Sequence, residues 1–257
     1  MPHIKQLQVT SYKLQGKNFL QSAVRCLLAA GGSQLVACSC MDIASLLAPF
    51  LPAPGLSPVQ LEQVRVYLDL LLRWNQKTNL TSVRKPEDIV TRHFGESFFL
   101  ASRLRQMEVA NAAAGGSGTH FIDLGSGAGF PGIPLKIYEP EFHGTLMESQ
   151  NKKATFLKEV IRALKLTGID VFNGRAEQWL QSSHTRVNLV TLRAVERFEQ
   201  VLPVAAELIG PKGRLALLIG AAQAETAHKL LPAFKWEAPC PVPQSHSRIL
   251  LMGHPRQ

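Results

Sequence analysis

The sequence has 257 residues, of which 46% are hydrophobic, and a formal net charge of +9. This length and composition favour one sizeable hydrophobic core with a smaller appendage, or two small domains. The sequence contains no run of about 18 apolar residues, so we expect no membrane-spanning helix. A basic chain suits a polyanionic partner, but many ordinary proteins are equally basic, so charge alone identifies no function.

Residues 1–40 differ in composition from the rest of the chain. They contain four basic residues, no acidic residue and three of the four cysteines, while Cys240 stands alone near the end. A C-x-C pair does not supply the four ligands of a zinc site, so we expect free thiols and no metal. Met41 is followed by Asp42, the first acid of the chain, and by an apolar run. We therefore expect the native chain to start near Met41, with 1–40 an extension outside the fold, which N-terminal sequencing of protein from its native host would test.

Residues 41–108 predict a small N-terminal helical unit. Ser57 can cap a helix whose first turn holds a proline, and Gln60 can complete a capping box with it. Apolar residues then recur at helical spacing over 61–74. A second helix is expected over 87–104, where large apolar residues again mark one side.

After a small-residue connector at 109–118, residues 119–257 alternate between strand-like and helix-like segments. The clearest helix is 151–165, which has one apolar face. The expected strands are 120–124, 144–148, 169–172, 187–192 and 213–219, followed by two late strands within 233–240 and 247–253. This rhythm predicts an α/β domain at 119–257 with a mostly parallel, doubly wound sheet.

The segment "DLGSGAGFPGIP" at 123–134 follows the first expected strand. In an open parallel sheet the ligand crevice lies beyond the carboxyl ends of the strands, and glycines there let a ligand approach the backbone. Gly127, Gly129 and Gly132 match the G-x-G-x-x-G fingerprint of a dinucleotide site, and Glu148 lies about 20 residues farther on, where an acid would bind a ribose.

The same segment also permits a second interpretation. Asp123 at the strand end and the glycines from Gly125 onward resemble motif I of class I S-adenosylmethionine-dependent methyltransferases. Glu148 suits both ligands, because each contains a ribose. Pro131 and Pro134 are unfavourable for a dinucleotide site, whose diphosphate needs free N–H groups at the start of the helix.

A longer pattern separates the two interpretations. The chain contains, in this order, "RWNQKTNLTSV", "RHFGES", "FIDLGSGAGFPGIPLKIYEP", "LMESQNKKATFLKEV", "GRAEQW" and "TLRAVE". This pattern closely resembles the ribosomal RNA small subunit methyltransferase G family, also called glucose-inhibited division protein B. The resemblance runs from about Leu56 to at least Gly220 and leaves residues 1–40 outside it.

The resemblance implies a Rossmann-like class I methyltransferase fold with S-adenosylmethionine as the methyl donor. It also implies methylation of a guanine N7 in the helix 18 loop of 16S rRNA, as free RNA or in a small ribosomal subunit particle. We accordingly expect a cytoplasmic monomer with no membrane partner.

The resemblance also assigns the cofactor-binding residues. They are Asp123, Gly125, Gly127, Gly129, Phe130, Glu148, Ala176, Glu177 and Arg193. Glu148 would take the ribose, Ala176 and Glu177 would flank the adenine, and Gly125 and Phe130 would line the pocket.

Lys152, Arg175 and Arg193 are the residues that we expect to be catalytic. The resemblance places Arg193 between cofactor and substrate, and the other two against the RNA or the target base. Guanine N7 carries a lone pair and no proton, so the reaction needs alignment rather than a catalytic base. We therefore assign no proton-transfer role to Glu96, and we expect His93 to pack or cap.

One position departs from the family pattern. The fifth strand of family members usually ends in Lys-Gly, whereas this chain has Ile219-Gly220. If that lysine faces RNA, its absence leaves open an RNA-binding member of the family with weak or no methyl transfer. A nicotinamide-dependent oxidoreductase is a third reading, but the chain shows no second dinucleotide-binding half.

Overall fold

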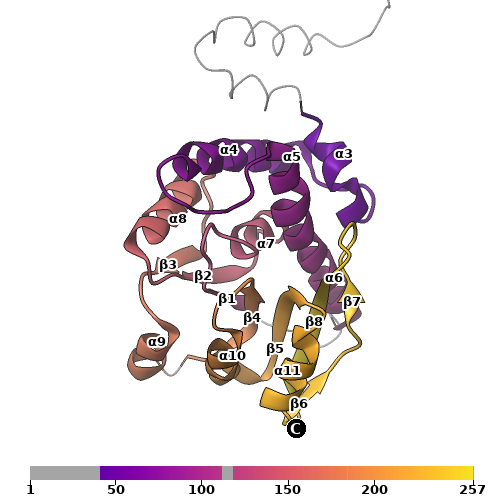
Figure 1. The fold of residues 1–257 in the computed structure, drawn as a ribbon, viewed down its shortest axis with the longest axis vertical. Helices are drawn as coiled ribbons and strands as arrows, with labels where there is room; N and C mark the ends of the chain where they lie inside the picture. Colours follow the sequence, from indigo (N-terminus) through magenta and orange to yellow (C-terminus); the bar gives the residue numbers. More distant parts are fainter. Residues whose placement is uncertain (1–40, 112–117, 184, 257) are drawn as a thin grey trace, which may run out of the picture. The chain divides into compact units, whose positions relative to one another are not determined.

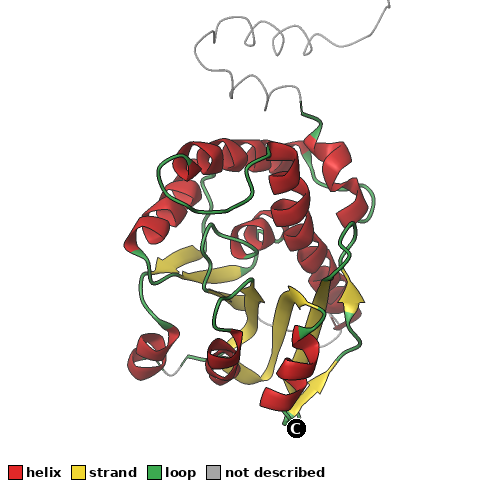
Figure 2. Cartoon of the chain, viewed as in Figure 1, coloured by secondary structure: helices red, strands yellow, loops and turns green. Residues whose placement is uncertain are grey.

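The computed structural model describes residues 41–111, 118–183 and 185–256 (Figure 1). Residues 1–40 lie outside the described residues, so the expected start near Met41 stays a prediction. From Asp42 onward the chain forms one compact unit, in which helices cover both faces of a central sheet (Figure 2).

The helix expected after Ser57 begins as the sequence predicts. Gln60 N donates to Ser57 Oγ (3.3 Å) and Ser57 N donates to Gln60 Oε1 (2.9 Å), which confirms the capping box. The elements are α3 (Ile43–Leu47), η1 (Ala48–Phe50), α4 (Pro58–Asn75), α5 (Pro86–Ile89), η2 (Val90–Gly95) and α6 (Glu96–Asn111).

The single helix expected over 87–104 is wrong, because the chain forms α5, the π-helix η2 and α6 in succession. All six residues of 93–98 are buried. One face of a regular α-helix does not bury six consecutive residues, and the wide π turn lies at this point. The turn thus directs both His93 and Phe94 into the interior.

Within the described residues, eight strands form one sheet in the order β3-β2-β1-β4-β5-β8-β6, with β7 paired to β8. They are β1 (His120–Leu124), β2 (His143–Met147), β3 (Ile169–Phe172), β4 (Val187–Arg193), β5 (Ile209–Gly220), β6 (Phe234–Trp236), β7 (Cys240–Pro241) and β8 (Arg248–Pro255). The pairs among β1 to β5 are parallel, and β8 is antiparallel to β5, β6 and β7. The predicted mostly parallel, doubly wound sheet is confirmed.

Several expected strands differ from the structure by one residue at an end, and two differences are larger. β5 begins at Ile209 rather than at residue 213, because its pairing with β4 shifts register between Val187 and Leu189 and the first paired residue precedes the shift. The two late strands expected within 233–240 and 247–253 are three, since β6 and β7 each pair separately with β8.

The crossover helices divide between the two faces of the sheet. They are α7 (Gly132–Tyr138), α8 (Asn151–Ala163), α9 (Ala176–Ser182), α10 (Phe198–Glu207) and α11 (Gln223–Leu230). Figure 1 shows α7 and α8 on the same side as α4 and α6, and α9, α10 and α11 on the other side. The carboxyl ends of β1, β2, β3 and β4 consequently meet at one edge, where the loops to α7, α8, α9 and α10 begin.

The described helices and side chains add two findings. No helix of the described ranges is long and apolar enough to cross a membrane. The same ranges hold no group of three His, Cys, Asp or Glu side chains that could bind a metal ion.

Candidate functional site

The loop at 125–131, which we call the glycine loop, connects β1 to α7. It is held by the carboxylate of Asp123, a residue that is 1% exposed. This carboxylate accepts hydrogen bonds from Ser126 Oγ (2.6 Å), Thr191 Oγ1 (2.8 Å) and Gly132 N (3.1 Å). Burial raises the pKa of Asp123, and these three bonds oppose the rise. Asp123 therefore joins the loop to β4 and α7 from beneath, and direct contact with a cofactor stays a prediction.

Two glycines of the loop are required for different reasons, open space at Gly127 and close packing at Gly129. Gly127 and Gly129 both have positive φ, +59° and +92°, in the left-handed region that favours glycine. A Cβ on Gly127 would approach only Gly125 O, at 3.8 Å, so the protein leaves room for a ligand against this backbone. A Cβ on Gly129 would instead collide with the Tyr67 hydroxyl and with Ile133 Cδ1, at 2.7 Å, so Gly129 is required for packing.

Glu148 follows β2 and holds the outer side of the glycine loop. Its Oε2 accepts from Gly127 N (3.0 Å) and its Oε1 accepts from Gln150 N (2.7 Å). Each carboxylate oxygen has a second lone pair, so Glu148 can still accept hydrogen bonds from a ligand diol. The predicted ribose contact thus fits the geometry of Glu148 and remains untested.

Aromatic rings support the loop from the side of the N-terminal helices. The Tyr67 hydroxyl donates to Ala128 O, and the Tyr67 ring stacks on Phe130 at 5.2 Å with planes 9° apart. Phe94 meets Phe130 edge to face at 5.0 Å. Burial, and next the charge of Asp123, raise the pKa of Tyr67 well above its ordinary value, so the phenol stays protonated and donates. Phe130, predicted to line the cofactor pocket, is 4% exposed and lies beneath the loop.

Arg193 ends β4 and turns toward the N-terminal helices. Its Nε and Nη2 both donate to Glu96 Oε2, at 3.1 and 3.0 Å, and Nη2 also donates to Arg92 O (2.9 Å). The side chains of Arg193 and Glu96 are 8% and 5% exposed. Burial lowers the pKa of Arg193, and the Glu96 carboxylate opposes the change. This buried ion pair joins β4 to the first turn of α6.

His93 completes the contact between the helices and Arg193. His93 Nδ1 lies 2.9 Å from Arg193 Nη2, and Nε2 lies 2.7 Å from Thr81 Oγ1. Because arginine only donates, the contact with Arg193 assigns the acceptor role to Nδ1 and the proton of the neutral ring to Nε2, which faces Thr81. Burial, followed by the charges of Arg193 and Arg92, lowers the pKa of His93 from 6.5 to about 3. The predicted packing role of His93 is confirmed by these contacts.

This lowered pKa predicts a pH dependence of stability. Between about pH 3 and 6.5 the unfolded chain protonates His93 and the folded chain does not, so stability must fall as the pH falls. Urea denaturation is expected to show wild type losing about 2 kcal/mol more than His93→Asn between about pH 7 and pH 5. Asparagine keeps an acceptor for Arg193 but does not titrate. Equal losses in the two proteins would show that His93 is not held neutral.

Lys152 and Arg175, both exposed, lie at the starts of α8 and α9, at the same edge as the glycine loop. Asn173 Nδ2 donates to Asn151 Oδ1 (2.7 Å), which joins the loop between β3 and α9 to the first residue of α8. Next to Arg175, α9 begins with a buried alanine and the exposed Glu177. The structure thus gathers the predicted basic residues and the predicted adenine neighbours at one edge.

Sequence reasoning missed Arg248, the first residue of β8. It pairs in register with Gly220, and its Nε lies 3.8 Å from Glu96 Oε1. No motif identifies it, because it approaches this edge only through the antiparallel pairing of β8 with β5. Ile219 itself is 3% exposed and packs in the core cluster under α10 and α11. Ile219, which stands where family members usually have lysine, therefore faces the core. Arg248 places a cation at the end of β5 instead.

Comparison with known proteins agrees with this geometry. The family model described as rRNA small subunit methyltransferase G matches residues 60–239. Curated relatives named "Ribosomal RNA small subunit methyltransferase G" include those of Desulfitobacterium hafniense (40% identical over 172 residues, 66% of each chain) and Bacillus subtilis (36% over 173 residues, 66% of this chain and 68% of the relative). The relative from Xylella fastidiosa is 38% identical over 193 residues, 73% of this chain and 84% of its own. The matches to the first two relatives thus span about two thirds of their length.

Among solved structures, MtNAS in complex with MTA and tNA matches with a TM-score of 0.50 and 14% identity, over 77% of this chain and 75% of that chain. At this identity the likeness concerns the fold alone, and it agrees with the Rossmann-like class I methyltransferase fold that the sequence predicts. The family model spans most of the chain and includes the glycine loop, Glu148 and Arg193. This chain belongs to the rRNA small subunit methyltransferase G family.

Proposed function

We propose that this protein transfers the methyl group of S-adenosylmethionine to N7 of a guanine in the helix 18 loop of 16S rRNA. The family match carries the proposal, and the glycine loop with its open backbone at Gly127 supports it. We further propose that the protein acts in the cytoplasm as a monomer, and that its substrate is free 16S rRNA or a small ribosomal subunit particle.

The residues at the carboxyl edge fit such a cofactor. Glu148 offers a carboxylate beside the open face of Gly127, which suits a ribose diol. The first turn of α9, with Ala176 and Glu177, lies at the same edge and suits the adenine. When bound, S-adenosylmethionine supplies an electrophilic methyl group on a positively charged sulfur. The protein's task is to hold this group and the guanine in line.

No catalytic base is required, and two of the acids near the site, Asp123 and Glu96, hold other protein groups. Asp123 holds the loop and Glu96 holds Arg193. The N7 lone pair attacks without prior loss of a proton, so the rate gain must come from alignment, which can contribute about 7–11 kcal/mol. The site is consistent with a reaction driven by positioning.

The three basic residues have two kinds of role in this proposal. The methylated base gains a positive charge, so a cation beside N7 would oppose the reaction. Lys152 and Arg175, both exposed, suit phosphates or the guanine O6, which only accepts hydrogen bonds. Arg193 acts as a positioning residue, because its guanidinium is committed to Glu96 and His93.

A methyl-transfer experiment tests the proposal directly. Purified protein, labelled S-adenosylmethionine and either 30S particles or protein-free 16S rRNA from a strain lacking this methylation are incubated, and the RNA is digested to nucleosides. We expect label in 7-methylguanosine, and RNA from the methylated parent strain as the control should accept none. Label in another nucleoside, or none despite cofactor binding in calorimetry, would contradict the proposed reaction.

A further inference from the structure

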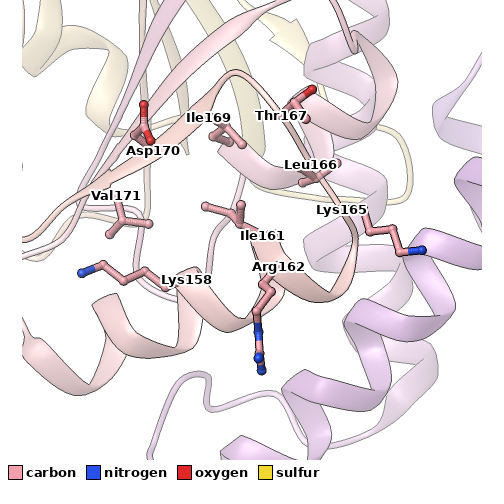
Figure 3. Close-up of a pocket in the computed structure, with 9 residues that line it drawn as sticks. All are labelled: Lys158, Ile161, Arg162, Lys165, Leu166, Thr167, Ile169, Asp170 and Val171. Atoms are coloured by element: carbon pink, nitrogen blue, oxygen red, sulfur yellow. The ribbon is translucent and has the colours of Figure 1, made fainter.

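Three cations lie along α8 and in the turn that follows it, away from the glycine loop. Lys158 and Arg162 are exposed on the helix, and Lys165 is exposed in the turn that follows it. We call these three residues the α8 basic face. The three residues are among those that line a surface pocket of about 460 Å³, and Figure 3 shows Ile161 of α8 pointing toward β3 while the three cationic head groups point in different directions.

The charges of the α8 basic face are not compensated within the described residues. Across 41–111, 118–183 and 185–256, none of its three head groups forms an ion pair. Asp170 is the acid among the residues that line the pocket. Like charges one helical turn apart repel one another, so this arrangement favours a polyanionic partner.

Lys165 stands where a glycine would be the ordinary choice. Its φ is +53°, and the bonds Lys165 N to Arg162 O (3.2 Å) and Leu166 N to Ile161 O (3.0 Å) form the motif that closes a helix with a left-handed residue. A lysine in this conformation is strained relative to glycine. The chain thus has a long cationic side chain at a position where glycine would make the fold more stable.

The α8 basic face continues away from the proposed reaction site. α8 starts where the parallel strands have their carboxyl ends, and exposed Lys152 is its second residue. The helix ends near the amino ends of these strands. Thirteen residues separate Lys152 from Lys165, which is about 20 Å along a helix. A strand of B-form DNA rises about 3.4 Å per nucleotide, and on that scale this distance corresponds to several nucleotides.

We propose that the α8 basic face and the groove between α8 and β3 bind the phosphate backbone of the RNA substrate, several nucleotides away from the guanine at the glycine loop. The inference rests on the proposed function, because it supplies the polyanion. The competing explanation is protection of the sheet, since β3 is its edge strand and charges beside an edge prevent pairing with other chains.

Salt-dependent RNA binding separates the two explanations. The variant Lys158→Gln/Arg162→Gln/Lys165→Gln is compared with Lys212→Gln/Lys229→Gln/Lys235→Gln, which removes the same charge from exposed residues on β5, α11 and β6. For the first variant we expect a 10- to 100-fold weaker Kd for a 16S rRNA fragment, and a slope of log K against log salt that is smaller by about 2 to 3 between about 50 and 200 mM salt. The control variant should stay within about threefold of wild type, because its cations lie outside the contact.

Equal effects of the two triple variants would overturn the inference. So would self-association of the first variant, measured by light scattering, with unchanged RNA affinity, because this result would identify edge protection. If wild type binds the RNA through this face but transfers no methyl group, the inference stands and the proposed reaction fails. If wild type does not bind the RNA, both fail.

Lys165→Gly gives a second readout that does not depend on damage to the fold. Glycine removes the strained lysine, so we expect the Tm to rise by about 2–4 °C while RNA affinity falls. A purely structural residue would not show this opposition. An increase in Tm with unchanged RNA affinity would remove Lys165 from the contact.

Discussion

Gly127→Arg is expected to reduce S-adenosylmethionine binding and methyl transfer by about 100-fold or more, a loss of about 3 kcal/mol or more in binding free energy. The backbone of Gly127 faces open space, so an arginine side chain fits there without colliding with protein and occupies the proposed cofactor position. The left-handed backbone, at φ +59°, adds strain of about 1–2 kcal/mol. Calorimetry of cofactor binding and the labelled-methyl assay measure the two effects.

Gly55→Arg is the matched control. Gly55 has a φ of +81° and no protein atom within 4 Å of an added Cβ, and it lies between η1 and α4, outside the glycine loop. The same substitution with the same kind of strain should therefore leave cofactor affinity within about twofold of wild type. If Gly127→Arg binds the cofactor as tightly as Gly55→Arg, the glycine loop is not the cofactor site.

Glu96→Leu is expected to destabilise the fold by about 3–5 kcal/mol in urea denaturation near neutral pH. The substitution leaves the buried Arg193 guanidinium without its carboxylate, and it also removes the partner of Arg248. A buried charge without a partner has lost its hydration free energy and gains no ion pair in return, and the packing of leucine does not offset this penalty.

Two comparisons make the Glu96 prediction specific. Glu96→Gln keeps an oxygen that can accept from Arg193 but removes the charge, so its loss of stability should be intermediate. Glu62→Gln breaks the exposed pair with Arg65 and should change stability by less than about 1 kcal/mol. A loss below about 1 kcal/mol in Glu96→Leu would mean that solvent, not Glu96, compensates Arg193.

The elements that local chemistry determines could be predicted from the sequence. β1 and β3 have the expected bounds, because short apolar runs flanked by turn residues identify buried strands. The helix start at Ser57 was equally predictable, since its capping box lies within four residues. The glycine loop was recognisable because its residue types report backbone conformation directly.

The connections across the fold could not be predicted in this way. Arg193 meets Glu96 and His93 about a hundred residues away in the chain, and Arg248 reaches the same group from β8. No local preference encodes such contacts, which arise only when the sheet order places β4 and β8 beside the N-terminal helices. Phe130 shows the same limit, because the motif indicates proximity to the ligand and not that the ring points inward against Tyr67.

The contact of Tyr67 and Phe130 means that the glycine loop is shared by two partners. On its inner side α4 holds the loop, and on its outer side the loop presents Gly127 to the proposed cofactor. If the proposed cofactor binds there and requires the same loop conformation as the packing of α4, each of the two interactions is expected to stabilise the other by the same free energy. Binding of the proposed cofactor would therefore strengthen the packing of the N-terminal helices on the sheet by the same free energy by which that packing strengthens cofactor binding.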